Sequence, residues 1–345
     1  MVGNAALAGA GIVSGTSHSC AISNNIAESG GGVYSGLYIG AYSGAFNNCL
    51  ISGNIAQYQG GGARGGTFNN CVFTGNIAGY GGAVDAEAGD GVLLNNCVVY
   101  GNSASSHGGG LASHGDIGRT FLWSSNCIVL SNSAPIDPNY SYLSTNEMKF
   151  DHCCVLPLPV NGVGNFVNNP LFVDPVAGDF RLQSNSPCIN AGNNAYVTNA
   201  TDLDGNPRIV GGTVDIGAYE FQSPTSLLSY AWAQKYGFLT DGTADFTDTD
   251  GDAMSNYGEW RSDTIPTNAL SVLRMVIATN SPTGAQVIWQ SVSTRSYWLE
   301  RATNLGSASP FFNIVSNIAG VAGAKTYTDA SATNAGPYFY RVGVQ

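Results

Sequence analysis

The residues best able to do chemistry lie in one short acidic stretch of the C-terminal third of the chain. Aspartates alternate with other residues at Asp248, Asp250 and Asp252, and Glu259 follows seven residues after the last of them. Four carboxylates so close together repel one another unless a cation lies between them. Calcium prefers six to eight oxygen ligands, and this spacing can direct them to one point. The stretch therefore predicts a calcium site, with a bare solvated acidic loop as the alternative.

The spacing matches the ligand positions of an EF-hand loop. The predicted ligands are Asp248, Asp250, Asp252, the backbone carbonyl of Met254, Asn256 and Glu259. The loop is similar to dockerin and thrombospondin type 3 loops, which implies an exported protein. Ala253 departs from the pattern, because glycine usually forms the sharp turn at this position. Gly251 is the alternative residue for that turn. An alanine at positive φ costs on the order of 1 kcal/mol, so the departure predicts weaker calcium binding.

Two helices and a β-domain are expected around this loop. Residues 227–236 place apolar side chains at helical spacing before Gly237, and a helix–loop–helix over 222–266 results. Residues 267–345 alternate short apolar runs with polar turns, which predicts a small β-sandwich of six strands. The segments 297–301 and 337–342 resemble a fibronectin type III-like module. Trp298 and Tyr338 are candidates for stacking on sugars, although aromatic residues of a sandwich more often lie in its core.

The N-terminal part of the chain repeats itself. Five cysteines are each followed by a large apolar residue at the second position, an asparagine at the fifth and an alanine at the seventh. These cysteines and asparagines are Cys20, Cys49, Cys71, Cys97 and Cys127 with Asn25, Asn54, Asn76, Asn102 and Asn132. Units of 22 to 30 residues leave room for about three short strands and their corners. Stacked units would align cysteine on cysteine and asparagine on asparagine, which predicts an all-β, right-handed parallel β-helix.

The repeats resemble those of polymorphic membrane proteins and related bacterial β-helix surface proteins. The motif residues are Phe73 to Asn76 with Gly81 to Val84, and Ile51 to Asn54 with Gly61 to Ala63. The resemblance covers residues 1–135 and implies adhesion or display, without a catalytic residue. Residues 136–221 contain a stretch similar to the choice-of-anchor Q segment of secreted β-helix proteins. This second resemblance implies irregular closing coils that cover the open end of the core, so that the β-helix spans 1–221.

The cysteines have two predicted roles. The evenly spaced ones favour a stack of buried thiols, with disulfides between coils or a metal site as alternatives. Cys153, Cys154 and Cys188 lie outside this frame. The resemblance of the closing segment implies a disulfide between Cys154 and Cys188. In the same segment, Asp215 and Glu220 are expected to bind turn amides or to pair with Arg208.

Composition narrows the function further. Only 10% of the residues are charged and the net charge is −11, which argues against a nucleic-acid partner. The chain has no apolar stretch long enough for a membrane helix, and its start does not read as a signal peptide. The resemblances above imply a secreted or cell-surface protein from which this chain is cut. We expect the chain to be a monomer whose partners are polysaccharides or surface glycans.

Parallel β-helices also include polysaccharide lyases and glycosidases, so an enzyme is the alternative. Asp85, Glu87, His114 and Asp116 would lie on neighbouring coils and are weak catalytic candidates. They could equally form a sugar-binding patch or a solvated face. Because residues 1–134 contain few charges with which to build an active site, the sequence favours a non-catalytic scaffold for adhesion or glycan binding, with a calcium-stabilised C-terminal junction.

Overall fold

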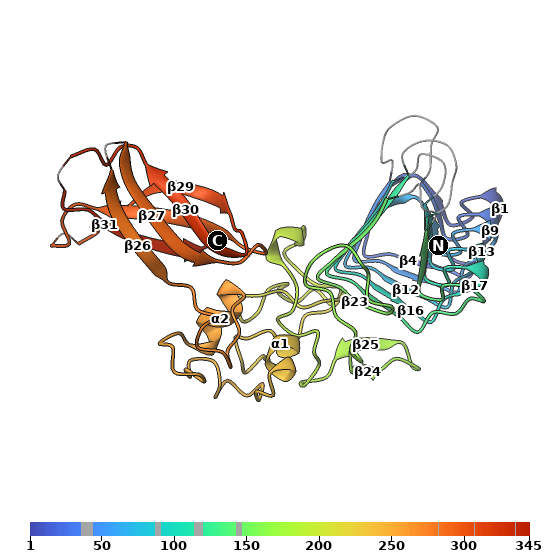
Figure 1. The fold of residues 1–345 in the computed structure, drawn as a ribbon. Coiled ribbons are helices and arrows are strands. Elements are labelled where there is room, and N and C mark those ends of the chain that lie inside the picture. Colours follow the sequence, from blue (N-terminus) through green and yellow to red (C-terminus); the bar gives the residue numbers. More distant parts are fainter. Residues whose placement is uncertain are drawn as a thin grey trace. The chain divides into compact units, whose positions relative to one another are not determined.

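The repeated pattern folds into a parallel β-solenoid, which confirms the predicted all-β class (Figure 1). The computed structural model describes residues 1–35, 44–86, 91–113, 120–142, 147–281, 283–306, 308–334 and 336–345. The chain divides into two units, Met1–Lys235 and Tyr236–Gln345. The first contains the solenoid and its closing segment, and the second contains the acidic loop and an antiparallel β-domain.

Four parallel sheets form the solenoid, and we number them in chain order. Sheet 1 comprises β1 (Ala5–Ala8), β5 (Ile26–Ser29), β9 (Ile55–Gln59), β13 (Ile77–Tyr80) and β17 (Ser103–His107). Sheet 2 comprises β2 (Ile12–Val13), β6 (Val33–Tyr34), β10 (Ala63–Arg64), β14 (Val84–Ala86), β18 (Leu111–Ser113) and β21 (Tyr140–Tyr142). Sheet 3 comprises β3 (Gly15–His18), β7 (Gly44–Asn47), β11 (Gly66–Asn69), β15 (Gly91–Asn95), β19 (Phe121–Ser125) and β22 (Glu147–Asp151). Sheet 4 comprises β4 (Ala21–Ser23), β8 (Leu50–Ser52), β12 (Val72–Thr74), β16 (Val98–Tyr100), β20 (Ile128–Leu130) and β23 (Cys154–Val155).

Most coils thus contribute four strands, where the sequence predicted about three. The additional corner lies between sheets 3 and 4, directly before each repeat cysteine. Asn48, Asn70, Asn96 and Asn126 occupy this corner with φ between 51° and 54°. Asparagine tolerates this left-handed backbone better than most residues, so it can turn the chain within one residue.

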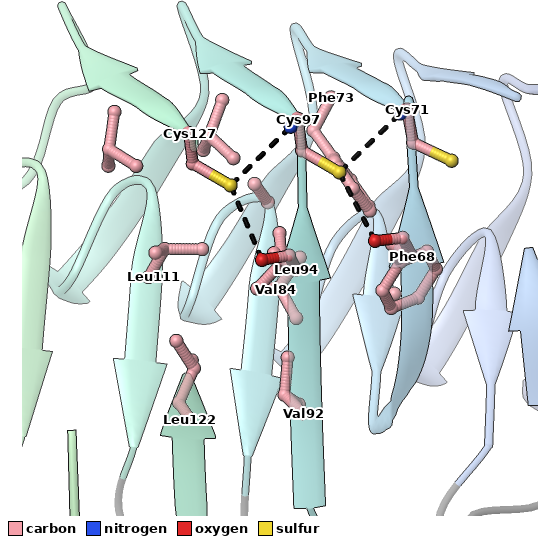
Figure 2. Packing of buried hydrophobic residues seen from close by; sticks show 14 of the residues in the cluster. Phe68, Cys71, Phe73, Val84, Val92, Leu94, Cys97, Leu111, Leu122 and Cys127 are labelled. Carbon is pink, nitrogen blue, oxygen red and sulfur yellow. Dashed lines mark hydrogen bonds between the residues drawn. The ribbon is translucent and has the colours of Figure 1, made fainter. Parts of the chain in front are cut away.

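The interior of the coils is apolar and in register (Figure 2). Ile51, Phe73 and Val99 align across sheet 4 and are fully buried. Phe46 and Phe68 stack at 5.2 Å between ring centroids. Like residues therefore lie on like residues from coil to coil, as the repeat predicted.

The closing segment contains β24 (Phe172–Asp174), β25 (Asp179–Leu182), the short 3-10 helix η1 (Asn194–Tyr196) and α1 (Tyr230–Lys235). The predicted closing segment, 136–221, does cover the end of the last strand in part, since Val155 N–H donates to Phe166 O at 3.0 Å. Most of its apolar side chains, and Tyr230 of α1 beyond it, pack instead against the outer face of sheet 4. The buried cluster joins Val72, Val98 and Ile128 of that face to Phe172, Phe180, Leu182, Ile189, Ile216 and Tyr230. The cause is that the strands of sheet 4 are apolar on both faces, as in parallel sheets covered on both sides.

The corner asparagines also hold the closing segment. Their Nδ2 atoms donate to backbone carbonyls of that segment: Asn48 to Asp202 at 3.1 Å, Asn70 to Thr201 at 2.8 Å, Asn96 to Tyr196 at 3.4 Å and Asn126 to Asn193 at 3.0 Å. One stretch of chain, residues 193–202, therefore forms hydrogen bonds with the corners of four successive coils. The repeat pattern in the sequence does not predict this contact.

A buried charge cluster stabilises the turns of the closing segment. Both carboxylate oxygens of Asp215 and of Glu220 accept backbone N–H groups. Arg208, which is 1% exposed, lies with its Nη1 3.6 Å from Glu220 Oε2. The expectation that these acids bind turn amides is confirmed for both, and Glu220 is the one whose carboxylate lies beside Arg208.

The second unit contains α2 (Asn256–Ser262) and two antiparallel three-stranded sheets. One sheet has the order β26 (Met275–Ser281), β27 (Gly284–Ser291), β30 (Gly323–Asp329). The other has the order β29 (Phe312–Ala319), β28 (Ser296–Ala302), β31 (Phe339–Val344). Val287, Trp289, Tyr297 and Leu299 form the centre of their shared core. The six predicted strands are present with shifts of a few residues at their ends.

Candidate metal centre

Three aspartates of the acidic stretch converge on one point. One carboxylate oxygen each of Asp248, Asp250 and Asp252 lies within 4.8 Å of the others. The loop is folded around the first of them, since Asp248 Oδ1 accepts the N–H of Gly251 at 2.8 Å and Oδ2 accepts the N–H of Ala253 at 2.9 Å. These two hydrogen bonds hold both oxygens of the Asp248 carboxylate in place.

The helix α2 places Glu259 close enough to the three aspartates for their charges to act on it, although its carboxylate is not one of the three that converge within 4.8 Å. The helix begins after Ser255, whose side chain accepts the N–H of Gly258 at 3.2 Å and so caps the first turn. Glu259 is completely buried, and no donor among the described residues reaches its Oε2. The same holds for both oxygens of Asp250 and for Oδ2 of Asp252 within the described part of the chain. Buried carboxylate oxygens normally have a partner, so these four oxygens are available as ligands for a cation.

The electrostatics of Glu259 agree with this geometry. Burial raises its pKa most, and the negative charges of Asp250, Asp252 and Asp248 raise it further, to about 7. A carboxylate with such neighbours gains from a nearby positive charge. The cluster can therefore hold a hard divalent cation through oxygen ligands.

The sharp turn of the loop does fall on the residue that departs from the EF-hand pattern. Ala253 has a φ of 74°, in the left-handed region, and Gly251 has a φ of 81°. Gly251 therefore does not replace the turn at Ala253 but adds a second left-handed residue. The strain at Ala253 remains in the loop, as expected from the sequence.

Of the other two predicted ligands, Met254 lies beside the cluster, since its N–H donates to Asp252 Oδ1 at 2.8 Å, and its carbonyl stays a predicted ligand. The Asn256 side chain is fully buried, where its Nδ2 donates to Ala244 O at 2.8 Å and its Oδ1 accepts from Thr249 Oγ1 at 2.9 Å. Asn256 therefore binds the chain that leads into the loop, and its amide is not directed to the carboxylate cluster as the sequence suggested.

The end of α2 is tied to the β-domain of the same unit. Arg295, in the turn between β27 and β28, donates from Nε to Arg261 O at 2.9 Å and from Nη2 to Trp260 O at 3.2 Å. Thr294 donates to the carboxylate of Asp263, the residue that ends the helix. A cation that fixes Glu259 would thus also fix the helix that contacts the β-domain.

The repeat cysteines form a column inside the solenoid (Figure 2). The N–H groups of Cys71, Cys97 and Cys127 each point to the sulfur of the cysteine on the next coil, at 3.4 Å. All eight cysteines are free thiols, and Cys20 and Cys49 lie at the N-terminal end of the column. Cys153, which lies outside the sequence frame, extends the column at its other end.

The repeat asparagines form a second column. In each step the backbone N–H and the Nδ2 of one asparagine both donate to Oδ1 of the next, at 2.9 to 3.1 Å. The steps run from Asn25 through Asn54, Asn76 and Asn102 to Asn132. Asn139 ends the column, although it stands only seven residues after Asn132. The repeat spacing of 22 to 30 residues therefore does not predict Asn139 as a member of the column.

Cys154 and Cys188 are both buried in the same apolar cluster, and after burial itself Cys154 is the main cause of the raised pKa of Cys188. We expect them to form a disulfide when the chain is produced in an oxidising compartment, because the fold brings the two thiols into one cluster. The oxidised protein should then be lighter by about 2 Da than the reduced protein, and peptide mapping should recover the linked pair. Alkylation of both thiols in protein that was never exposed to reductant would contradict this prediction.

The weak catalytic candidates are not assembled by the described residues. Asp85 lies in β14, in register with Arg64 of β10 and Ala112 of β18, and it is fully buried. Glu87, His114 and Asp116 lie outside the described residues. The set therefore cannot be placed as one site.

Comparisons of the chain with protein-family models, with curated proteins and with solved structures find no match. The class that its fold defines is a parallel β-solenoid joined to an antiparallel β-domain. Neither helix of the described chain has the length and apolar character that crossing a membrane requires.

Proposed function

We propose that this chain is a non-catalytic extracellular scaffold in which a β-solenoid is joined to a calcium-stabilised C-terminal unit. The observation that carries the calcium assignment is the buried Oε2 of Glu259, which has no hydrogen-bond partner among the described residues. The negative charges of Asp248, Asp250 and Asp252, which cluster together, raise the pKa of Glu259. Calcium is the cation whose preference for several carboxylate oxygens this set fits best. Millimolar calcium outside cells would fill even a weak site of this kind.

Calcium binding is tested by calorimetry on the full chain. We expect a dissociation constant of about 10⁻⁴ to 10⁻³ M, as in extracellular modules. Asp250→Ala should weaken binding by about tenfold or more, because both Asp250 oxygens lack other partners. Asp241→Asn is the matched control, since this exposed acid lies in the same stretch but outside the cluster. A wild-type chain that releases no heat with calcium, or an Asp250→Ala variant that binds like the wild type, would refute the site.

The strained turn gives an independent prediction. Ala253→Gly should bind calcium about fivefold more tightly, because glycine removes a left-handed strain of about 1 kcal/mol from the loop. The same titration measures this gain. Unchanged or weaker binding would show that the loop conformation with φ of 74° at position 253 is not the one that holds the ion.

The scaffold assignment is supported by what fills the coils. The interior contains apolar side chains and two columns of polar residues. In the thiol column each cysteine contacts the cysteine of the next coil, and in the asparagine column each asparagine contacts the asparagine of the next coil. Asp85 is buried where a polysaccharide cannot reach its carboxylate. Adhesion or glycan binding is the role that this architecture favours in an exported chain.

A further inference from the structure

The outer face of one sheet of the second unit carries an aromatic and charged surface, built on β28 and β31. Tyr297 and Leu299 of β28 are buried in the core of the unit, so Trp298 between them points to the opposite face. Trp298 is half-buried and pairs in register with Gly343 of β31. Its indole is therefore displayed on the sheet and does not belong to the core.

Gly343 allows the indole to lie flat across the neighbouring strand. A Cβ atom at Gly343 would lie 2.1 Å from Cζ2, 2.4 Å from Cε2 and 2.8 Å from Cη2 of Trp298. Contacts this short with three ring atoms require that the indole covers the glycine. A strand glycine of this kind marks close approach by another group, and here the group is the tryptophan ring.

Polar groups stand directly beside the ring. Arg341 and Glu300 form the register pair two residues further along, on the same face of the sheet, and Arg341 Nε lies 2.6 Å from Glu300 Oε2. The Arg341 guanidinium lies 5.7 Å from the Trp298 ring centroid and 4.5 Å from that of Phe311. The Arg341 side chain is 53% exposed, so donors remain at the surface although its charge is balanced by Glu300.

We propose that Trp298, Phe311, Arg341 and Glu300 form a platform for a neutral polysaccharide. The flat C–H faces of sugar rings pack on the electron-rich face of an indole, and the Arg341–Glu300 pair offers both donors and acceptors to hydroxyl groups. A neutral glycan fits better than an anionic one, because the ion pair is internally balanced and the chain has a net charge of −11. Tyr338, the other candidate from the sequence, belongs to a different group, because its ring lies 4.9 Å from the guanidinium of Arg301, which is paired with Asp329. The platform gives the proposed scaffold a ligand class and rests on its extracellular role.

Native gel electrophoresis through embedded polysaccharides tests the platform. The full chain should be retarded in at least one gel containing xylan, mixed-linkage β-glucan or galactomannan, and Trp298→Ala should weaken this retardation by about tenfold or more. Trp298→Phe should retain part of it, because a smaller ring still presents a flat face. Gly343→Ala should also weaken it, since the added methyl group displaces the indole.

Phe246→Ala is the matched control, because Phe246 is 70% exposed and lies in the acidic loop region, outside the platform. Retardation of the wild type in none of the three gels, retardation only by pectin or heparin, or equal retardation of Trp298→Ala would overturn the proposal. Pull-down of a protein partner that depends on Trp298, without retardation by sugars, would assign the surface to protein docking instead. Calcium titration of Trp298→Ala should match the wild type, so failure of the platform is separable from failure of the metal centre.

Discussion

Replacing Asn76 by alanine is expected to lower the free energy of unfolding of the solenoid by about 4 kcal/mol. Asn76 Oδ1 accepts from the backbone N–H and the Nδ2 of Asn54, and its own Nδ2 donates to Ile51 O and to Asn102 Oδ1. The residue is fully buried, so alanine would leave these groups without water as a substitute. Each orphaned buried group costs about 1 to 3 kcal/mol.

Urea unfolding followed by pulse-labelling hydrogen exchange measures this loss separately in each unit. Peptides from the first unit should become exchangeable at lower urea concentration in Asn76→Ala than in the wild type. Asn161→Ala serves as the control, because Asn161 is exposed and its loss should change stability little. If Asn76→Ala unfolds at the same urea concentration as Asn161→Ala, the asparagine column does not hold the coils together.

The second large effect is expected in the other unit. Asp329→Ala should destabilise the β-domain by about 3 to 5 kcal/mol, because it leaves the guanidinium of Arg301 buried without its counter-charge. Arg301 Nη1 lies 2.6 Å from Asp329 Oδ2, and the two residues are 9% and 2% exposed. Tyr340 also donates to Asp329 Oδ2, at 3.1 Å.

The exposed pair Arg341–Glu300 lies on the sheet that contains Arg301 and provides the comparison. Glu300→Ala should cost less than about 1 kcal/mol, because water replaces a surface ion pair readily. Hydrogen exchange of peptides from the second unit measures both variants. If Asp329→Ala and Glu300→Ala lower the free energy of unfolding equally, burial does not make the Arg301–Asp329 pair more stabilising than the exposed pair.

The pair also predicts how stability changes in acid. Burial raises the pKa of Asp329, but hydrogen bonds from Ser331 and Tyr340 and the charge of Arg301 outweigh it, so the pKa is lowered. A lowered pKa gives stability that is present above about pH 4 and is lost as the pH falls through the folded value. The stability difference between the wild type and Asp329→Ala should therefore shrink as the pH falls below about 4.

The solenoid could be predicted from sequence because its columns are made of residue types that recur at fixed offsets. Cys71 and Phe73 mark one strand face, and Asn76 marks the corner that follows. The acidic loop could be found for a similar reason, since ligand spacing is local in the sequence. In both cases the structure is set by residues close together in the chain.

What could not be predicted depends on contacts between distant residues. The outer face of sheet 4 carries Val72, Val98 and Ile128, and this apolar column was a sign that something covers it. The repeat pattern is defined by the inward-facing residues on either side of them, such as Cys71 and Phe73 around Val72, and does not include the outer face. Asn256 illustrates the same limit, because its spacing fits a ligand while its amide is bound to Ala244 and Thr249.

The contacts of residues 193–202 with four corner asparagines bear on how such a chain can change in evolution. Asn48 and Asn126 bind the two ends of that stretch, so its reach is matched to the rise of the coils between them. Duplicating or deleting one repeat there would shift every later asparagine by one layer, about 4.8 Å, relative to its carbonyl partner. We therefore expect descendants that keep residues 193–202 to keep the same number of coils between Asn48 and Asn126. Coils before Asn48 can be added or lost without disturbing these contacts.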